Sequence, residues 1–475
     1  MLARNDHERR DVRRSPRRSG LAVLEVSVSQ DRRVAVIGLG YVGLPLAISF
    51  AEAGLSVEGV DLSDRRVAEL LDRHSPIDDI SDARLSSALD GGLSVRHPAE
   101  ARLADADAIF VCVPTPVTAT KDPDLGPVIG AAETVRAGLR AGQLVVLQST
   151  TFPGTTRGPF CDVLEAGGLK AGHDFDLAFA PERVNPGDPG SSGRAIPRLV
   201  GGTTAAATTR AAALLRTIND RVVELSSPEA AELAKLLENV FRNINIALVN
   251  NLALLCERMG LDVWEVIDAA ATKPFGFMRF TPGPGVGGHC IPVDPYYLSW
   301  RAREFDFVDR FIELAGDINV GMPRHVVDLA AQALNERGRS LKGARVGVVG
   351  AAFKPNVQDA RNSPSAEVIA GLAERGADVF FHDPLVPTFR DASGVVRQSQ
   401  GLDAIAGADL VVVLVQHDAV DWERLYREAD LILDTVNSSA GRSTQRRQVL
   451  RLGAGWSEAT DAAEAATVGA RVASG

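Results

Sequence analysis

One cysteine of this chain lies where a cysteine used for packing is not expected. Cys290 belongs to the segment Pro-Gly-Pro-Gly-Val-Gly-Gly-His-Cys-Ile-Pro-Val-Asp at residues 282–294. Packing cysteines belong inside apolar periodic segments, whereas glycines at 283, 285, 287 and 288 would let a backbone and a bulky ligand come close to this sulfur. Taken alone, the segment fits a reactive thiol and a tight turn equally well.

A glycine-rich loop near the start of the chain has the spacing of a dinucleotide site. Gly38-x-Gly40-x-x-Gly43 follows an apolar β-branched run and opens an expected helix. In that context the glycines give a tight turn, close approach of a pyrophosphate and helix packing. Asp61 ends the next expected strand and can hold both ribose hydroxyls while repelling a 2′-phosphate, which predicts NAD. Arg66 leaves two alternatives, a contact to a 2′-phosphate or one to the adenosine side.

These motifs need a scaffold, and the sequence predicts two α/β halves. Short apolar runs expected to be strands alternate with helical stretches, at residues 33–40, 57–61, 108–113, 144–148 and 177–180, and again at 344–350, 378–382, 410–415 and 431–434. Between the halves, a helical pattern runs from Pro228 to about Met259, with a capping hydroxyl expected from Ser226-Ser227 at its start. The predicted fold class is α/β, with two Rossmann-like doubly wound domains joined by a long central helix.

Composition excludes several classes of protein. The 475 residues carry a formal net charge of -10, which argues against nucleic acid or a membrane surface as the main partner. No apolar run reaches the roughly 18 residues that a membrane span needs. The four cysteines, at 112, 161, 256 and 290, show no paired spacing, so we expect no disulfide framework, no metal site and a reducing cytoplasm.

Taken in order, the motifs resemble the UDP-glucose/GDP-mannose dehydrogenase family. The resemblance covers residues 33 to about 440 and is carried by Val-Ile-Gly-Leu-Gly-Tyr-Val-Gly-Leu-Pro at 36–45, Val-Cys-Val-Pro-Thr-Pro at 111–116, Ser-Thr-Thr at 149–151, Ala-Pro-Glu-Arg at 180–183, Lys235-x-x-x-Asn239, the cysteine segment, and Phe353-Lys354 with Arg361. It implies oxidation of C6 of a nucleotide-linked hexose to a carboxylic acid with reduction of two NAD+. A Cys290 thiolate would form a thiohemiacetal and then a thioester, which hydrolyses.

The resemblance also implies roles for five residues besides the cysteine. Lys235 and Asn239, one helical turn apart, would meet the developing oxyanion. Asp294 resembles the partner of an active-site water, Glu182 the general base of thioester hydrolysis, and Thr150 a hydroxyl near the reacting carbon.

The expected binding residues form two sets, and no metal ligand is expected. The cofactor set comprises Gly38, Gly40, Tyr41, Val42, Gly43, Asp61, Arg66, Thr115, Ser149, Thr150 and Arg361. The set for the UDP-sugar comprises Glu182, Arg183, Val184, Lys235, Asn239, Gly287 and Lys354.

The segment around the cysteine bears on the sugar. His289 and Val293 resemble the branch that acts on UDP-N-acetylglucosamine or related N-acetylhexosamines, with UDP-glucose and UDP-N-acetylmannosamine as alternatives. Val436 stands where many relatives have an arginine. Either Lys273 or Arg279 could reach the substrate or a neighbouring subunit. The pathway could lead to a surface polysaccharide or to a glycosylated small molecule.

We expect five parts along the chain: a disordered basic extension at 1–30, an NAD-binding domain at 31–222, a central helical domain at 223–335, a nucleotide-sugar domain at 336–453 and a frayed tail at 454–475. The long helix predicts a homodimer. Two other classes compete with this interpretation. A single-step β-hydroxyacid dehydrogenase would need neither the cysteine nor the second α/β domain, and a non-catalytic nucleotide-sugar-binding protein would not need the catalytic set.

Overall fold

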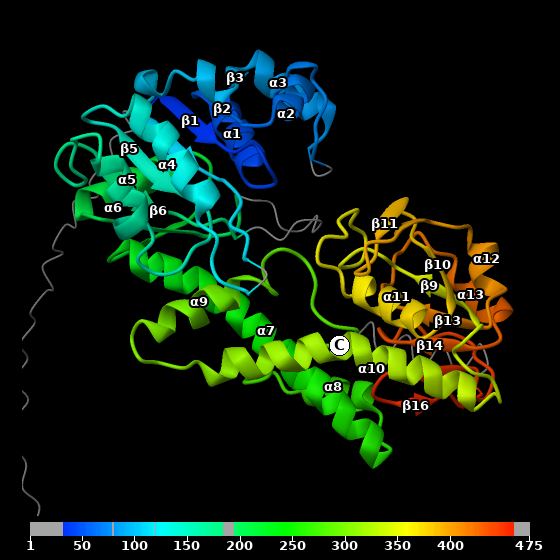
Figure 1. Cartoon of the computed structure of the whole chain (residues 1–475). Helices are drawn as coiled ribbons and strands as arrows, with labels where there is room; N and C mark the ends of the chain where they lie inside the picture. The colour runs from blue at the N-terminus through cyan, green and yellow to red at the C-terminus, as the bar shows by residue number, and fades with distance from the viewer. Residues whose placement is uncertain (1–31, 78–79, 119, 184–193, 460–475) are drawn as a thin grey trace, which may run out of the picture.

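The structure, a computed structural model, describes residues 32–77, 80–118, 120–183 and 194–459. Figure 1 shows an N-terminal α/β lobe in blue to green and a C-terminal α/β lobe in yellow to red, with the long helices α7 (Pro228–Met259) and α10 (Arg310–Asn335) below and between them. The predicted fold class is therefore confirmed. The expected extension at 1–30 lies outside the described residues.

The N-terminal lobe is built on an eight-stranded sheet in the order β3-β2-β1-β4-β5-β6-β7-β8. Neighbouring strands are parallel except for β6 and β7. The strands are β1 (Arg33–Ile37), β2 (Ser56–Val60), β3 (Leu93–Arg96), β4 (Ala108–Val111), β5 (Leu144–Leu147), β6 (Asp176–Phe179), β7 (Arg198–Gly202) and β8 (Val222–Leu225). The connecting helices are α1 (Gly43–Glu52), α2 (Asp64–Leu71), α3 (Asp82–Asp90), α4 (Gly126–Gly138), α5 (Cys161–Glu165) and α6 (Ala205–Leu215), with short turns η1 (Pro98–Glu100), η2 (Leu103–Asp105) and η3 (Thr156–Phe160).

Three strands of this sheet are not predicted from the sequence. Every residue of β4 and β5 is buried, which produces the continuous apolar runs that identify a central parallel strand. β3 and β8 are partly exposed and lack such a run. β7 ends in two glycines, and a Cβ at Gly201 would lie 2.0 Å from the carbonyl oxygen of Ser227. The glycine is there because the start of α7 crosses the strand at that point.

The central region consists of α7, α8 (Val263–Ala271), α9 (Asp294–Arg303) and α10. The expected start of α7 is confirmed, since Ser227 Oγ accepts a hydrogen bond from the Ala230 N–H, and the helix ends at Gly260 in the left-handed region at φ 68°. Helix α10 was not predicted as a helix, because Gly316 and Pro323 interrupt its helical pattern.

Three buried asparagines fix α7 against α10. Asn250 Nδ2 donates to Asn319 Oδ1 over 2.9 Å, and Asn319 Nδ2 donates to Asn243 Oδ1 over 2.9 Å. Asn250 Oδ1 in turn accepts from the N–H of Gly283, 3.0 Å away in the cysteine segment. Buried amides that find mutual partners hold one register, so these contacts set where the cysteine segment leaves the helix pair.

The C-terminal lobe has a six-stranded sheet in the order β10-β9-β13-β14-β15-β16, parallel except for β15 and β16. Its strands are β9 (Arg345–Val349), β10 (Asp378–His382), β13 (Leu410–Val413), β14 (Ile432–Asp434), β15 (Val449–Arg451) and β16 (Gly455–Trp456), with a hairpin of β11 (Thr388–Arg390) and β12 (Val396–Gln398). The helices are α11 (Pro364–Glu374), α12 (Leu402–Ala406) and α13 (Trp422–Glu428).

The expectation of a frayed tail from residue 454 is wrong at its start. Trp456 of β16 pairs with Leu450, and the N–H of Ser457 donates to the carbonyl of Val449 over 2.8 Å. Two residues give too short an apolar pattern to be recognised in the sequence. Residues 460–475 lie outside the described part. No helix among the described residues combines the length and apolarity needed to cross a membrane.

Candidate active site

A cavity of about 3320 Å³ opens along the carboxyl ends of the N-terminal strands and continues past the cysteine segment to α10 and α11. Ligands of doubly wound sheets bind at this edge. The predicted site residues that line it are Gly38, Gly40, Tyr41, Val42, Asp61, Arg66, Thr115, Ser149, Thr150, Glu182, Lys235, Cys290, Asp294 and Arg361. The predicted residues Gly43, Arg183, Asn239, Gly287 and Lys354 are not among its lining residues, and Val184 lies outside the described residues.

The glycine loop has the backbone that a dinucleotide site requires. Gly38 has φ +89°, and a Cβ there would lie 2.6 Å from the carbonyl oxygen of Cys112. A Cβ at Gly43 would lie 1.8 Å from the Gly38 oxygen, so this glycine serves packing of α1 and not direct binding. At Gly40 a Cβ would meet nothing within 4 Å, which leaves the first turn of α1 open to a phosphate.

The acid after β2 is held ready for a ribose. Asp61 is 7% exposed, and its two carboxylate oxygens accept from the N–H groups of Leu39 (2.8 Å) and Ser63 (2.9 Å). Arg66 Nη1 lies 3.5 Å from Asp61 Oδ2, so the arginine is engaged with this carboxylate. On the floor of the cavity, Gln148 Nε2 is buried without a hydrogen-bond partner among the described residues. A ligand with a diol for Asp61 and a hydrogen-bond acceptor for Gln148 Nε2 would fit these groups, and NAD offers both.

Cys290 lies four residues before α9 begins at Asp294, and it lines the cavity. Burial raises the pKa of the thiol to about 11, and the nearby Asp294 carboxylate adds to the shift, whereas Lys235 opposes it. The Nδ1 of His289 lies 3.6 Å from the sulfur. The surrounding protein and the Arg361 cation lower the pKa of His289. A neutral imidazole therefore stands beside a protonated thiol at neutral pH.

Two predicted catalytic residues meet directly beside the cysteine. Asn239 Nδ2, on α7, donates to Asp294 Oδ2, on α9, over 2.6 Å. Asp294 is 3% exposed, and burial raises its pKa to about 7 against the opposing effects of Lys235 and the Asn239 bond. The predicted proximity of Lys235, Asn239, Asp294 and Cys290 is thus what the structure shows. Asn239 does not line the cavity, so its contact with the site is the hydrogen bond to Asp294.

The segment after β6 is held by ion pairs. Glu182 Oε2 lies 2.5 Å from Arg198 Nη2, and its Oε1 accepts from the N–H of Arg183 at 2.7 Å. Arg183 turns away from the cavity, because it pairs with Glu238 on α7 at 2.6 Å and donates to the carbonyl of Pro197. Glu182 is therefore an oriented carboxylate at the wall of the cavity.

The glycines of the cysteine segment make room for protein. A Cβ at Gly287 would lie 2.8 Å from Phe353 Cβ, and one at Gly288, which has φ +87°, would lie 3.1 Å from the Phe353 ring. The Cβ position of Gly287 is therefore filled by the C-terminal lobe, and its role in binding the UDP-sugar stays a prediction. Lys354 Nζ lies 5.8 Å from the centroid of the same ring, and this residue does not line the cavity.

Arg361 brings a cation from the C-terminal lobe to the cofactor loop. It pairs with Asp359 through Nε and Nη2, at 2.9 and 2.6 Å, and its guanidinium lies 5.0 Å from the centroid of the Tyr41 ring. The Asp359 contact raises the pKa of Arg361. The two lobes therefore touch at the cavity, as a two-substrate reaction requires.

Two positioning residues were missed from the sequence. Glu232, one turn before Lys235 on α7, accepts from the N–H groups of Gly154 (2.6 Å) and Thr156 (2.9 Å) and from the Thr156 hydroxyl. Burial raises its pKa to about 7. Tyr297 of α9 is fully buried and donates to the carbonyl of Pro116 over 2.9 Å. The only signal in the sequence was the run Pro-Tyr-Tyr-Leu that follows Asp294, which indicates that Tyr297 belongs to a buried segment.

The remaining cysteines do not compete with Cys290. Cys112, Cys161 and Cys256 are buried and free, and burial raises the pKa of each of their thiols. The interpretation of Cys256 as a core residue of α7 is confirmed. Cys112 lines the cavity and donates to Gln148 Oε1, so it lies beside the expected cofactor.

Three family models match the chain in succession. The NAD binding domain of the UDP-glucose/GDP-mannose dehydrogenase family matches residues 32–219, its central domain residues 229–320 and its UDP binding domain residues 347–440. The chain belongs to this family. It is an NAD-dependent nucleotide-sugar dehydrogenase, which confirms the enzyme class and the cofactor predicted from the sequence.

Relatives of this family member act on more than one sugar. It is 38% identical over 359 residues to a UDP-N-acetyl-D-glucosamine 6-dehydrogenase of Pseudomonas aeruginosa, covering 75% of this chain and 84% of that protein. It is 36% identical over 398 residues to a UDP-N-acetyl-D-mannosamine dehydrogenase of Pyrococcus horikoshii, covering 83% of this chain and 92% of that protein. A solved UDP-D-ManNAc dehydrogenase structure from Pyrococcus horikoshii matches with a TM-score of 0.78 at 33% identity, covering 89% and 99% of the two chains.

Proposed function

We propose that this enzyme oxidises C6 of a UDP-linked N-acetylhexosamine, in the first place UDP-N-acetyl-D-glucosamine, to the uronic acid through a thioester on Cys290. The observation that carries the proposal is the convergence of Cys290, Lys235 and Asp294 on one cavity whose other end is the Gly38 loop. A nucleophile, a cation and a carboxylate beside a dinucleotide site are what a four-electron oxidation of an alcohol needs.

Gly38, Gly40 and Asp61 would hold NAD+, and two NAD+ bound one after the other would each accept one hydride. Around the sugar, Lys235 faces the oxygen on C6, and its positive charge stabilises the alkoxide and later the oxyanion. Once the aldehyde has formed, the Cys290 sulfur bonds to C6, and the thiol proton passes through a neighbouring base to the aldehyde oxygen, which becomes the thiohemiacetal hydroxyl. Loss of the second hydride and the hydroxyl proton from the thiohemiacetal leaves a thioester.

Hydrolysis regenerates the cysteine. Water adds to the thioester carbonyl and the C–S bond breaks. The carboxylic acid is released, and the Cys290 sulfur takes up one proton to become a thiol again. Glu182 is the carboxylate oriented for the role of general base, since Arg198 fixes it at the wall of the cavity. Asp294, buried and bonded to Asn239, holds the water on the side of the cysteine. Thr150 lines the same cavity and offers a hydroxyl to the reacting carbon.

The NADH yield per sugar tests the proposal. UDP-N-acetylglucosamine, UDP-N-acetylmannosamine, UDP-glucose and GDP-mannose are offered separately, and we expect two NADH per molecule of the first, with slower turnover of the others. One NADH per sugar would place the enzyme with single-step dehydrogenases. Absence of turnover with every sugar despite NAD binding would favour a non-catalytic nucleotide-sugar-binding protein. The variant Cys290→Ser should bind NAD normally and form no acid, and full activity of this variant would refute the thioester.

We infer that the enzyme is a homodimer formed through the central helices. Exposed apolar side chains follow one another along α7, at Leu233, Leu237, Phe241, Leu248 and Leu255. The segment between α9 and α10 adds Phe305, Phe307 and Val308, and the start of α10 adds Phe311 and Leu314. Exposed apolar side chains in such number are typical of a subunit contact. Light scattering should give twice the chain mass, and Leu237→Lys should shift it toward the monomer; a wild-type monomer would refute the dimer.

The compartment follows from the proposed chemistry. A nucleophilic thiol has to stay reduced, and the four cysteines are free. We therefore place the enzyme in the cytoplasm, where UDP-sugars for a surface polysaccharide or a small glycosylated product would be made. Loss of activity on mild oxidation, reversed by a thiol reductant, is the expected result; an enzyme indifferent to oxidants would not fit.

A further inference from the structure

The C-terminal lobe repeats the cofactor loop of the N-terminal lobe. In the N-terminal lobe Gly38, with φ +89°, follows β1, and Asp61 at the end of β2 accepts the N–H of the residue after that glycine. In the C-terminal lobe Gly350, with φ +95°, follows β9, and Asp383 at the end of β10 accepts the N–H of the residue after it, 2.7 Å away. The two loops share a turn and a carboxylate that braces it.

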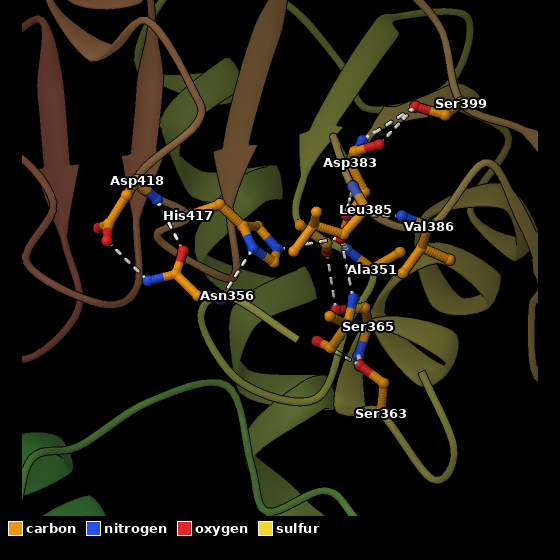
Figure 2. Close-up of polar contacts among 12 residues, drawn as sticks. Ala351, Asn356, Ser363, Ser365, Asp383, Leu385, Val386, Ser399, His417 and Asp418 are labelled. Atoms are coloured by element: carbon orange, nitrogen blue, oxygen red, sulfur yellow. Dashed lines mark hydrogen bonds and ion pairs between the residues drawn. The ribbon is translucent and has the colours of Figure 1, made fainter. Parts of the chain in front are cut away.

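The two carboxylates differ in what stands beside them. Asp61 lines the cavity, whereas Asp383 is sealed by His417, which follows β13 (Figure 2). His417 Nε2 lies 3.1 Å from Asp383 Oδ2, and both side chains have 0% exposure. His417 Nδ1 accepts the N–H of Asn356 over 3.1 Å. Because Nδ1 accepts, the proton of the neutral ring is on Nε2, where it donates to Asp383.

The histidine therefore anchors the loop at residues 350–363, which we call the bridge loop. Asn356 has φ +59°, a left-handed conformation that needs support outside glycine. Its side chain supplies part of that support, since Nδ2 donates to Asp418 Oδ2 over 2.8 Å and Oδ1 accepts the N–H of Asp418 over 2.9 Å. Ser363 Oγ closes the loop by donating to the carbonyl of Ala352.

The far end of the bridge loop holds the cysteine segment. Asn362 Nδ2 donates to the carbonyl of Gly288 over 3.0 Å, and the N–H of Gly288 donates to the carbonyl of Arg361 over 3.2 Å. Phe353 packs where Gly287 has no Cβ. Gly288 is two residues before Cys290, so a shift of the loop moves the backbone that carries the sulfur.

We propose that Asp383 and His417 are positioning residues, which fix the bridge loop and through it the place of Cys290 in the active site. The turn and carboxylate that form the expected phosphate loop in one lobe would thus serve in the other to hold the segment of Cys290. The proposal rests on Cys290 being the nucleophile. Neither residue touches the substrate, because neither lines the cavity. Their effect on the rate comes from placement alone, and a misplacement of about 1 Å can cost about 100-fold in rate.

Two substitutions of His417, each of which keeps one of its two hydrogen-bonding groups, test the proposal. His417→Gln keeps a donor for Asp383 and loses the acceptor for Asn356. His417→Asn keeps an acceptor near the place of Nδ1 and loses the donor to Asp383, which still accepts the N–H groups of Ala351 and Ala352. We expect His417→Gln to lower kcat by about tenfold or more, with the KM for NAD within about twofold, and His417→Asn to keep kcat within about threefold. Amide hydrogen exchange over residues 353–362 and 285–292 should be faster in His417→Gln than in His417→Asn.

A control separates placement from general loss of stability. Gln448 is buried in the same lobe and bonds to Tyr426, Ala429 and Gln445, none of them in the bridge loop. Gln448→Ala should lower the melting temperature without changing kcat or exchange at 285–292. Equal impairment of Gln448→Ala and His417→Gln, or wild-type kcat in a folded His417→Gln, would overturn the proposal. Equal impairment of the two histidine variants would also overturn it, because the Asn356 acceptor would then not matter.

The test does not depend on the proposed function. If Cys290→Ser were fully active, the thioester would fail, while the exchange of residues 285–292 in the His417 variants would still decide whether the pair places this segment. Should His417→Gln not fold, Asp418→Ala removes the side-chain pair of Asn356 from an exposed position. It should shift kcat and exchange in the same direction by a smaller factor, and no shift would overturn the proposal.

Discussion

Asn239 and Asp294 are joined by a hydrogen bond of 2.6 Å between helix α7 and the first turn of α9. The same α7 carries Lys235 one turn earlier, and the same segment carries Cys290 four residues before Asp294. The bond therefore ties the side of the site that carries Lys235 to the side that carries Cys290. Asp294 is buried, which favours its neutral form, and the hydrogen bond from Asn239 favours its ionised form.

Replacing Asp294 by Asn should stabilise the protein more at high pH than at low pH. Burial raises the pKa of Asp294 to about 7, above the value of about 3.9 expected in the unfolded chain. Between these values the unfolded state ionises while the folded state keeps the proton, so wild-type stability falls as pH rises toward 7. The variant lacks this penalty, and its advantage should grow by about 3 kcal/mol from pH 5 to pH 8.

Melting temperatures at the two pH values measure the effect. The exposed Asp105 gives the control, since Asp105→Asn should shift the melting temperature equally at both. A difference between Asp294→Asn and wild type that is the same at pH 5 and pH 8 would mean that Asp294 is ionised throughout.

Alkylation of Cys290 in the free enzyme should be slow at neutral pH and should accelerate with base. Burial raises its pKa to about 11, so the thiolate fraction rises about tenfold per pH unit between pH 7 and pH 10. Carboxymethylation followed by mass spectrometry gives the rate at this residue, with the buried Cys256 as the unreactive internal reference. A plateau reached below pH 8.5 would show that cations nearby dominate over burial.

Removing Glu232 should loosen the segment that follows Thr150. Glu232→Ala leaves the N–H groups of Gly154 and Thr156 without their acceptor, and an unpaired buried donor costs about 1–3 kcal/mol. We expect a lower melting temperature and a lower kcat. Glu229→Ala is the matched control one turn earlier, because it removes a more exposed carboxylate that pairs with Arg157. Similar losses in both variants would mean that the effect belongs to the helix and not to the buried contact.

Candidate site residues whose chemistry depends on their neighbours in the sequence could be predicted from the sequence. Gly38 and Asp61 were recognisable because one loop and the next strand fix their chemistry, and Cys290 because its neighbours are glycines. His417 and Glu232 could not be recognised, because their partners are distant in sequence, 34 and 76 residues away for Asp383 and Thr156. The same holds for the fold, where buried central strands show in the sequence, whereas short edge strands and the proline-containing α10 depend on tertiary packing.

Cofactor preference should change when Asp61 is replaced by Ser. Its carboxylate would repel a 2′-phosphate, and it also engages Arg66, 3.5 Å away. Without it the guanidinium is released to bind that phosphate, so the ratio of kcat/KM for NADP to that for NAD should rise by about 10- to 100-fold. The double variant Asp61→Ser, Arg66→Gln should lose most of this gain. An unchanged ratio in Asp61→Ser would show that discrimination lies elsewhere in the cavity, and a gain that survives the loss of Arg66 would show that removal of repulsion alone is enough.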